Sequence, residues 1–148
     1  MSAKFTFRLE AAIGQRARAE QSAQLAYARA IQEHRSAQEA LDALRLLAAE
    51  GRREVSTLGT PMDTERRMNL LLYVDQATLR ARHQEQVVAR RTAEVEEAQL
   101  TLRQAAARRR ALERLRERRL EEFTTEERMR VERELDERTT LRYARGKA

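Results

Sequence analysis

The stretch Ser56-Thr57-Leu58-Gly59-Thr60-Pro61-Met62-Asp63 interrupts a chain that is otherwise rich in helix-forming residues, and it contains the only proline. Its second threonine suits the N-cap of a helix, its proline the first helical position, and its aspartate can reach back to the capping residue. We therefore expect a turn over about residues 58–62, around Gly59, followed by a new helix from about residue 63.

Composition limits the fold that can surround this turn. Of the 148 residues, 36% are charged and only 4% are aromatic. Ala, Leu, Glu, Arg and Gln dominate the chain and favour helix, whereas the residues that favour strands and tight hairpins are sparse. The sequence predicts an all-α protein without the material for a thick globular core.

Before the turn, apolar residues recur in alternating steps of three and four, which is the heptad pattern of a coiled coil. The apolar members of this first seam are Leu9, Ile13, Ala23, Tyr27, Ala30, Ala37, Leu41, Leu44, Ala48, Val55 and Leu58. The same series passes through Arg16, Glu20, His34 and Gly51, which are not apolar. We expect a first helix over about residues 5–57.

After the turn, a second seam repeats the same spacing. Its apolar members are Val74, Ala77, Ala81, Val88, Val95, Ala98, Leu102, Ala105 and Leu112, with interruptions at Gln84, Arg91 and Arg109. We expect a second helix over about residues 63–140 and a frayed C-terminus. Two helices with such narrow apolar seams must pair, so residues 1–148 are predicted to form a single domain, a long antiparallel two-helix coiled-coil hairpin.

The register of this hairpin can be predicted if the chain folds back about Gly59. Facing residue numbers then sum to about 118, which places Leu41 beside Ala77 and Ala30 beside Val88. A slip of one heptad preserves the pattern but moves the turn away from Gly59. We therefore expect the register that sums to about 118.

The second predicted helix is longer than the first and should overhang it after about Leu112. The overhang would include residues 103–119, which carry eight Arg and two Glu. The sequence Thr124-Thr125-Glu126-Glu127 has the pattern of another capping box, which predicts a kink or a restart of the helix near residues 123–125.

Catalytic, metal and cofactor sites are not expected. The two histidines lie on different predicted helices, there is no cysteine, and the four glycines are isolated, so neither a metal site nor a phosphate loop can be assembled from a motif. Absence of cysteine also excludes disulfides and leaves the redox compartment open. The longest run of large apolar residues covers only residues 70–74, so we expect a soluble, unexported protein without a membrane span.

Two features exceed what a coiled coil requires. Leu70, Leu71, Leu72, Tyr73 and Val74 are consecutive, although a two-stranded seam buries only two positions in seven. Together with Leu46 and Leu47 they form either a locally broadened core or an exposed docking surface for another protein.

The second feature is a cluster of arginines in a chain whose net charge is +6. Such a cluster is compatible with a solvated helix, an acidic protein partner, a nucleic acid or an anionic membrane surface. Nucleic-acid binding is disfavoured because aromatic residues for base stacking are missing from the segment.

The sequence resembles the FliJ family of the bacterial flagellar type III export apparatus over nearly its full length. The opening Phe5-Thr6-Phe7-Arg8-Leu9-Glu10 is similar to the phenylalanine-rich start of the family. The series Tyr73-Val74, Ala77, Ala81, Gln84 and Val88 has the family's spacing, although Ala77 and Ala81 are smaller than usual. The stretch from Arg110 to Arg119, then Glu122-Phe123 and Leu135-Asp136-Glu137, resembles the closing section.

This resemblance implies a non-enzymatic stalk and general chaperone that acts in flagellum biogenesis and motility. The expected partners are the hexameric export ATPase and its regulator, the cytoplasmic domain of the export gate, and export chaperones, with no cofactor and no nucleic acid. The protein would be cytoplasmic and peripheral at the inner membrane, attached only through the export apparatus. The alternatives are the stalk of an injectisome, which shares the architecture, and a basic coiled-coil protein that binds nucleic acid.

The resemblance also assigns candidate site residues on two surfaces. The gate contact would lie near the turn and include Leu44, Leu47, Tyr73, Ala77 and Gln84. The contact with the ATPase ring would use the arginine cluster Arg108, Arg109, Arg110, Arg114, Arg116, Arg118 and Arg119.

Overall fold

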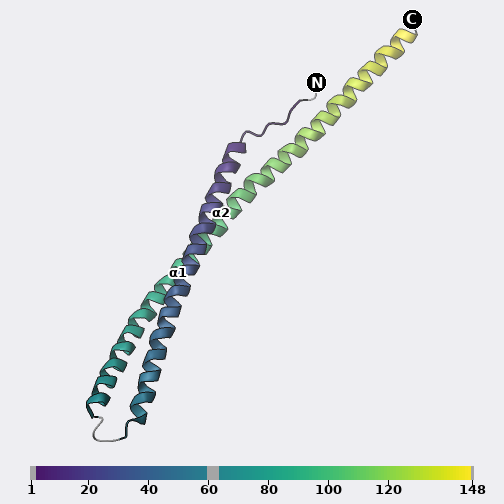
Figure 1. Ribbon diagram of the computed structural model, residues 1–148. Coiled ribbons are helices and arrows are strands. Elements are labelled where there is room, and N and C mark those ends of the chain that lie inside the picture. The colour runs from purple at the N-terminus through teal and green to yellow at the C-terminus, as the bar shows by residue number, and fades with distance from the viewer. Residues whose placement is uncertain (1–2, 60–63, 148) are drawn as a thin grey trace. The chain divides into compact units, whose positions relative to one another are not determined.

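The computed structural model describes residues 3–59 and 64–147 and contains two helices, α1 over Glu10–Thr57 and α2 over Thr64–Gly146. The described residues contain no strand, and the helices pack against each other as a hairpin (Figure 1), so the predicted all-α fold is confirmed. The predicted cap formed by Thr60, Pro61 and Asp63 lies outside the described residues.

The chain divides into two compact units, each built from a stretch of both helices. One unit comprises Gln21–Arg103 and includes the turn, and the other comprises Met1–Glu20 and Gln104–Ala148. In both units the residues of the predicted seams lie between the two helices. Of the first seam only Leu9 and Arg16 are exposed, and every position of the second seam is buried or half-buried. The heptad pattern therefore identified the buried face correctly.

Helix α1 begins five residues later than the sequence predicted. Residues 3–7 are not helical, and the helix starts at Glu10, whose amide donates a hydrogen bond to the Phe7 carbonyl at 3.2 Å. The physical reason is the spacing of Phe5 and Phe7. Residues two apart point to the same side only in an extended chain, and in a helix these two rings would diverge.

Helix α2 runs without interruption through the stretch that was expected to restart it. The hydroxyl of Thr124 donates to the carbonyl of Leu120 at 2.8 Å, and that of Thr125 to the carbonyl of Glu121 at 2.9 Å. These are the back-bonds of threonines inside a helix, not the bonds of an N-cap. The predicted break near residues 123–125 is wrong, and α2 continues to Gly146.

The core of the unit that holds the turn is made mainly of small side chains. Its seven buried apolar residues are Ala23, Ala37, Leu41, Ala48, Val74, Ala77 and Ala81. Five of these are alanine, so the helix axes can approach closely while little apolar area is removed from water. The stability of this pair therefore depends on close backbone packing more than on large buried side chains.

A close approach of the two helices occurs at Gly51, a seam position that carries no side chain. A Cβ atom placed on Gly51 would lie 2.5 Å from Cγ2 and 3.9 Å from Cβ of Val74. Glycine is required there because any side chain would overlap the valine. This contact pairs residue numbers that sum to 125.

The predicted register is therefore wrong by one heptad. In agreement with the Gly51 contact, Arg45 pairs with Glu85 at 3.0 Å and Arg116 pairs with Glu10 at 2.9 Å. These two pairs have number sums of 130 and 126, which fit the sum of 125 and not the predicted value of about 118. The amide of Gln84 also donates to the carbonyl of Ala37 at 3.0 Å. The shift moves the midpoint of the hairpin from Gly59 into residues that the structure does not describe.

The register can be tested with cysteines, because the natural chain has none. We expect a Gly51→Cys, Val74→Cys variant to oxidise to an intramolecular disulfide, since the 3.9 Å between the Cβ positions suits the bond. A Leu44→Cys, Val74→Cys variant, which matches the sequence-derived register, should stay reduced. Non-reducing gel mobility and thiol titration of the monomer measure the outcome. Oxidation of the second pair alone would contradict the observed register.

Candidate functional site

The five residues predicted to contact an export gate separate into surface and core. Tyr73 and Leu47 are exposed to 45% and 40% of their full area. Leu44 is half-buried and Ala77 is buried in the helix pair. Gln84 is half-buried and is held by its bond to the carbonyl of Ala37. Only Leu47 and Tyr73 can therefore present much of their side chains to a partner.

Leu47 and Tyr73 lie on the same flank of the hairpin, although they come from different helices. The ion pair between Arg66 and Glu54, 2.9 Å long, marks this flank closer to the turn. Leu47 precedes Glu54 by seven residues and Tyr73 follows Arg66 by seven. Because two turns of helix return a side chain to the same face, the two apolar side chains face each other one heptad further from the turn.

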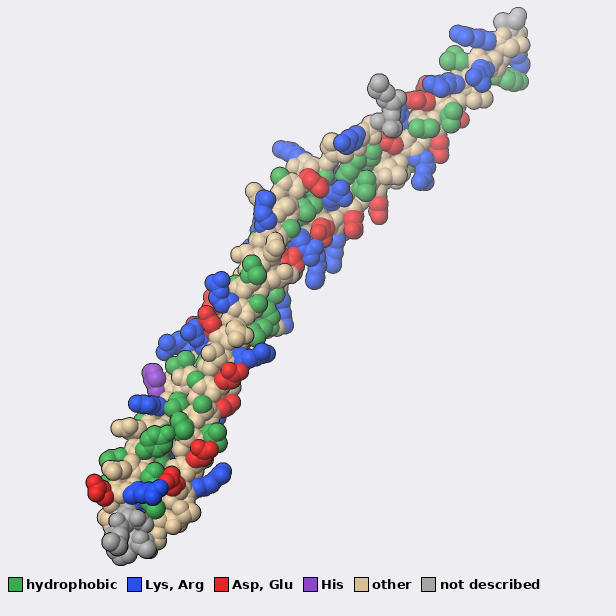
Figure 2. All heavy atoms as spheres, in the orientation of Figure 1, with side chains coloured by type: hydrophobic (Ala, Val, Ile, Leu, Met, Phe, Trp, Pro, Cys, Tyr) green, Lys and Arg blue, Asp and Glu red, His purple; other side chains and the backbone are tan. Residues whose placement is uncertain are grey.

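Exposed apolar side chains surround this pair, and we define the apolar patch as the whole set. Its members are Leu46, Leu47, Met68, Leu71, Leu72, Tyr73 and Leu79, all at least 40% exposed. Figure 2 shows hydrophobic side chains on the surface of this part of the molecule. Of the five consecutive apolar residues, only Val74 is buried, while Leu70 is half-buried. The run of apolar residues over 70–74 is therefore better explained as an exposed surface than as a locally broadened core.

Met68 and Leu79 were not identified as surface residues from the sequence. A signal was present, since Met68, Leu72 and Leu79 are separated by four and seven residues and so share one outer face of α2. None of the three lies on the seam. A second apolar stripe off the seam of a coiled coil indicates a surface that is available for contact.

The opposite flank of the same unit is polar. Arg45 pairs with Glu85 at 3.0 Å, and Arg52 donates to the hydroxyl of Thr78 at 3.2 Å. By heptad position these four residues line the other side of the seam from Leu47 and Tyr73. The unit therefore has one flank that is mainly polar, on which Leu71 lies one heptad before Thr78, and one flank that presents Leu47 and Tyr73.

In the other unit, Arg109 belongs to the interior of the helix pair. Its guanidinium donates to Glu20 on α1 and to both carboxylate oxygens of Glu113 at 2.8 Å. Only 26% of the Arg109 side chain and 13% of the Glu20 side chain are exposed. The hydrogen bond from Arg109 lowers the pKa of Glu20, and the same bond raises the pKa of Arg109. Arg109 is therefore a structural residue and is not available to a partner.

Two further arginines of the predicted cluster are also engaged. Arg116 pairs with Glu10 at 2.9 Å and lies 5.9 Å from the centre of the Phe5 ring. Arg119 pairs with Glu122 at 3.0 Å. The predicted overhang of α2 is present, but it begins later than Leu112, because α1 and the segment before it contact α2 as far as Arg116 and Phe123.

The remaining members of the cluster face solvent. The side chains of Arg108, Arg110, Arg114 and Arg118 are exposed, and no ion pair among the described residues includes them. We call these four the basic patch. Uncovered helix begins only near Arg128, from which every described residue to Lys147 is exposed. Arg130 supports that stretch through Glu127 at 2.9 Å and Glu134 at 2.6 Å.

Within residues 3–59 and 64–147, neither a candidate metal site nor a candidate membrane span is found. These residues contain no group of three or more His, Cys, Asp or Glu side chains placed to hold a metal ion. None of the helices in the described part of the chain is both long and apolar enough to cross a membrane. The arrangement supports contact with partners through surfaces.

Comparison with known proteins gives one result for the whole chain. A family model described as flagellar FliJ protein matches residues 5–148. No curated protein and no solved structure matches the chain.

The Glu20–Arg109 pair predicts a specific dependence of stability on pH. Because folding lowers the pKa of Glu20 from 4.5, the pair stabilises the fold above that value and loses its effect as pH falls below it. We expect Glu20→Gln to melt below the natural chain at about pH 6 and the difference to shrink toward about pH 3. Circular dichroism melting curves measure it. Glu39→Gln, at an exposed position with no ion pair to any described residue, should show little difference at either pH, and an equal effect there would contradict the assignment.

Proposed function

We propose a function for this chain from the premise that it belongs to the FliJ family. Membership makes it a component of flagellar protein export. The finer proposal is a non-enzymatic stalk and general chaperone that binds and stimulates the export ATPase ring and contacts the export gate. The observation that carries it is the presence of two chemically different exposed surfaces, the apolar patch in one unit and the basic patch in the other.

The apolar patch is the proposed contact with the cytoplasmic domain of the gate. Leu47 and Tyr73 support this role because they are exposed on one flank, and removal of such side chains from water is favourable in an interface. In this proposal Ala77 and Gln84 support the contact surface and do not touch the gate themselves. Ala77 is buried in the seam beside the patch, and Gln84 ties α2 to the backbone of α1.

The basic patch is the proposed contact with the export ATPase. Arg108, Arg110, Arg114 and Arg118 can pair with carboxylates of a protein surface, for which the fork of donors on a guanidinium is well suited. The ATPase regulator and export chaperones are further proposed partners. The proposed location is the cytoplasmic face of the inner membrane, with attachment to the membrane only through the export apparatus.

A charge reversal tests the ATPase contact. When the chain is titrated into the export ATPase of the same organism, we expect hydrolysis and ring formation to increase. R108E/R110E should weaken the effect by about tenfold because complementary charges are replaced by like charges. R29E/R90E changes the net charge equally at two exposed positions outside the basic patch and should behave as the natural chain.

Two results, one from this titration and one from a separate DNA-binding measurement, would reject the proposal. If hydrolysis and ring formation both stay unchanged, the proposed stalk function is rejected. Tight binding to DNA that falls steeply with salt, without any effect on the ATPase, would favour the nucleic-acid alternative.

A truncation tests the gate contact. Tyr73→Ala should leave helicity and melting temperature nearly unchanged, since the side chain is 45% exposed, but should weaken binding to the gate domain by about tenfold. Leu25→Ala, at a position 67% exposed and outside the apolar patch, is the matched control. Isothermal titration calorimetry measures binding to the gate domain, and circular dichroism measures helicity and melting temperature. Loss of thermal stability with unchanged binding would assign Tyr73 to the core instead.

A further inference from the structure

The apolar seams by themselves permit the two helices to slip by one heptad. We call the register predicted from the sequence the slipped register, because facing residues of α1 lie seven positions earlier in it than in the observed register. Seam residues still meet seam residues after such a shift, and five of the seven buried apolar residues are alanine. Apart from the contact between Gly51 and Val74, the apolar residues therefore give little preference for one register.

Two arginines on the seam of α2 bind carboxylates of α1. Arg109 donates two bonds to Glu20, of which the one from its second terminal nitrogen is 3.4 Å long. Arg91 donates to Glu33 at 2.8 Å. Both arginines are half-buried at positions where an apolar residue is usual, so each brings a positive charge between the helices.

The slipped register would separate Arg109 from Glu20. Ile13 would take the place of Glu20 beside Arg109, and Leu102 would take the place of Arg109 beside Glu20. Glu113 lies on α2 and stays with Arg109 in either register. Glu20, however, is largely buried, and a buried charge that loses its partner is strongly unfavourable.

Arg91 would lose its carboxylate on α1 in the same way. Ala26 lies seven positions before Glu33 and would replace it beside Arg91. Glu94, which pairs with Arg91 at 2.8 Å, belongs to α2 and does not change with the register. The bond to Glu33 is therefore the one that distinguishes the two registers at this level.

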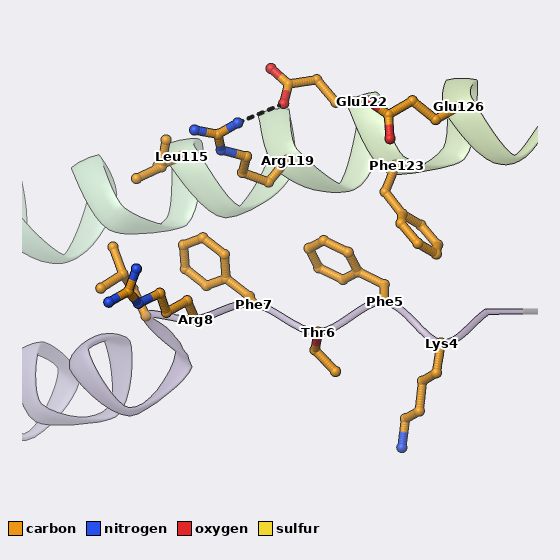
Figure 3. Close-up of a pocket in the computed structure, with 11 residues that line it drawn as sticks. Lys4, Phe5, Thr6, Phe7, Arg8, Leu115, Arg119, Glu122, Phe123 and Glu126 are labelled. Carbon is orange, nitrogen blue, oxygen red and sulfur yellow. Dashed lines mark hydrogen bonds and ion pairs between the residues drawn. The ribbon is translucent and has the colours of Figure 1, made fainter.

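Other polar contacts do not distinguish the registers in this way. Gln84, the third polar residue on the seam of α2, donates to the backbone carbonyl of Ala37, and the slipped register offers a backbone carbonyl at the same level. The pair of Arg119 and Glu122, drawn as a dashed line in Figure 3, lies within α2. Exposed ion pairs that join the two helices near the turn contribute little.

We propose that Arg91 and Arg109 select the observed register of the hairpin, because each meets a carboxylate of α1 only in that register. A buried ion pair adds little net stability, since desolvation of the charges offsets their attraction, but separating the two charges is costly. Polar residues at single seam positions specify the register of coiled coils for the same reason.

The selected register also determines the surface of the hairpin. Tyr73 faces Leu47 on one flank in the observed register, and both side chains belong to the apolar patch. In the slipped register Tyr73 would face Ala40, and Leu47 would lie one heptad away from it. The apolar patch is therefore assembled across the two helices only in the register that the arginines select.

The test moves the carboxylates of α1 by one heptad, so that the arginines find them only in the slipped register. Composition and net charge stay the same in this exchange variant, which carries Ile13→Glu, Glu20→Ile, Ala26→Glu and Glu33→Ala. Every protein in the test also carries Val74→Ala. This change removes the methyl groups that fit against Gly51 and leaves the ion pairs to decide between the registers.

Two cysteine pairs, placed in separate proteins, report the register. Ala30→Cys with Val95→Cys matches the observed register, since these positions lie three heptads from Gly51 and Val74. Ala30→Cys with Val88→Cys matches the slipped register. With the natural carboxylates we expect only the first pair to form an intramolecular disulfide. In the exchange variant the yield of the second disulfide relative to the first should rise at least about tenfold.

Gln84→Leu is the matched control, because it removes a polar seam residue whose bond does not depend on the register. It should leave the first disulfide as the main product. The inference is overturned if the first pair alone still oxidises in an exchange variant that circular dichroism shows to be helical. It is also overturned if the second pair oxidises readily while the natural carboxylates are in place.

A milder variant keeps the test decisive if the full exchange does not fold. Ala26→Glu with Glu33→Ala changes only exposed positions and leaves the seam intact. It should still raise the yield of the second disulfide, and no increase would overturn the inference. The readout is a disulfide within one chain, so the result does not depend on whether the proposed partners bind.

Discussion

The contact between Gly51 and Val74 is the constraint on which the helix pair around the turn depends. Because Gly51 has no side chain, Val74 can lie against the backbone of α1, where any Cβ atom would be only 2.5 Å from its methyl group. This single pairing fixes which heptads face each other. It thereby brings Leu47 to the level of Tyr73 on one flank and Arg45 to the level of Glu85 on the other. The apolar patch is a consequence of that register.

The fold class and the buried face of each helix could be predicted from the sequence, but the register could not. A shift by one heptad leaves every seam residue on the seam, so the hydrophobic pattern does not distinguish the two alignments. With five alanines among the seven buried apolar residues, large side chains do not identify their partners either. In the sequence, Gly51 interrupts the apolar seam, and only its contact with Val74 in the structure shows that the two helices pack closely at this position.

The candidate sites were predicted less completely than the fold, and the apolar patch and the arginine cluster differ in this respect. Five consecutive apolar residues exceed what a two-stranded seam can bury, but the sequence left open whether they form a broadened core or an exposed surface, and the structure exposes Leu71, Leu72 and Tyr73. The arginine cluster was predicted as one exposed, uncovered stretch, whereas the structure divides it among the seam, ion pairs and solvent. That error arose partly because the predicted register was wrong by one heptad, and partly because the first residues were assigned to a helix. Phe5 and Phe7, two positions apart, already carry the period of an extended segment that can lie along α2.

The ion pairs of Arg109 with Glu20 and Glu113 inside the helix pair also affect the charge of the neighbouring surface. Arg109 takes up Glu20 from α1 and Glu113 from α2, so one cation engages two carboxylates of the same neighbourhood. Those carboxylates point toward Arg109 and make no ion pair with the exposed arginines among the described residues. Arg108, Arg110, Arg114 and Arg118 face solvent. Arg109 occupies a seam position at which an apolar residue would bury more apolar area. Because it engages two carboxylates there, the adjoining surface is more basic than the composition of this stretch alone implies.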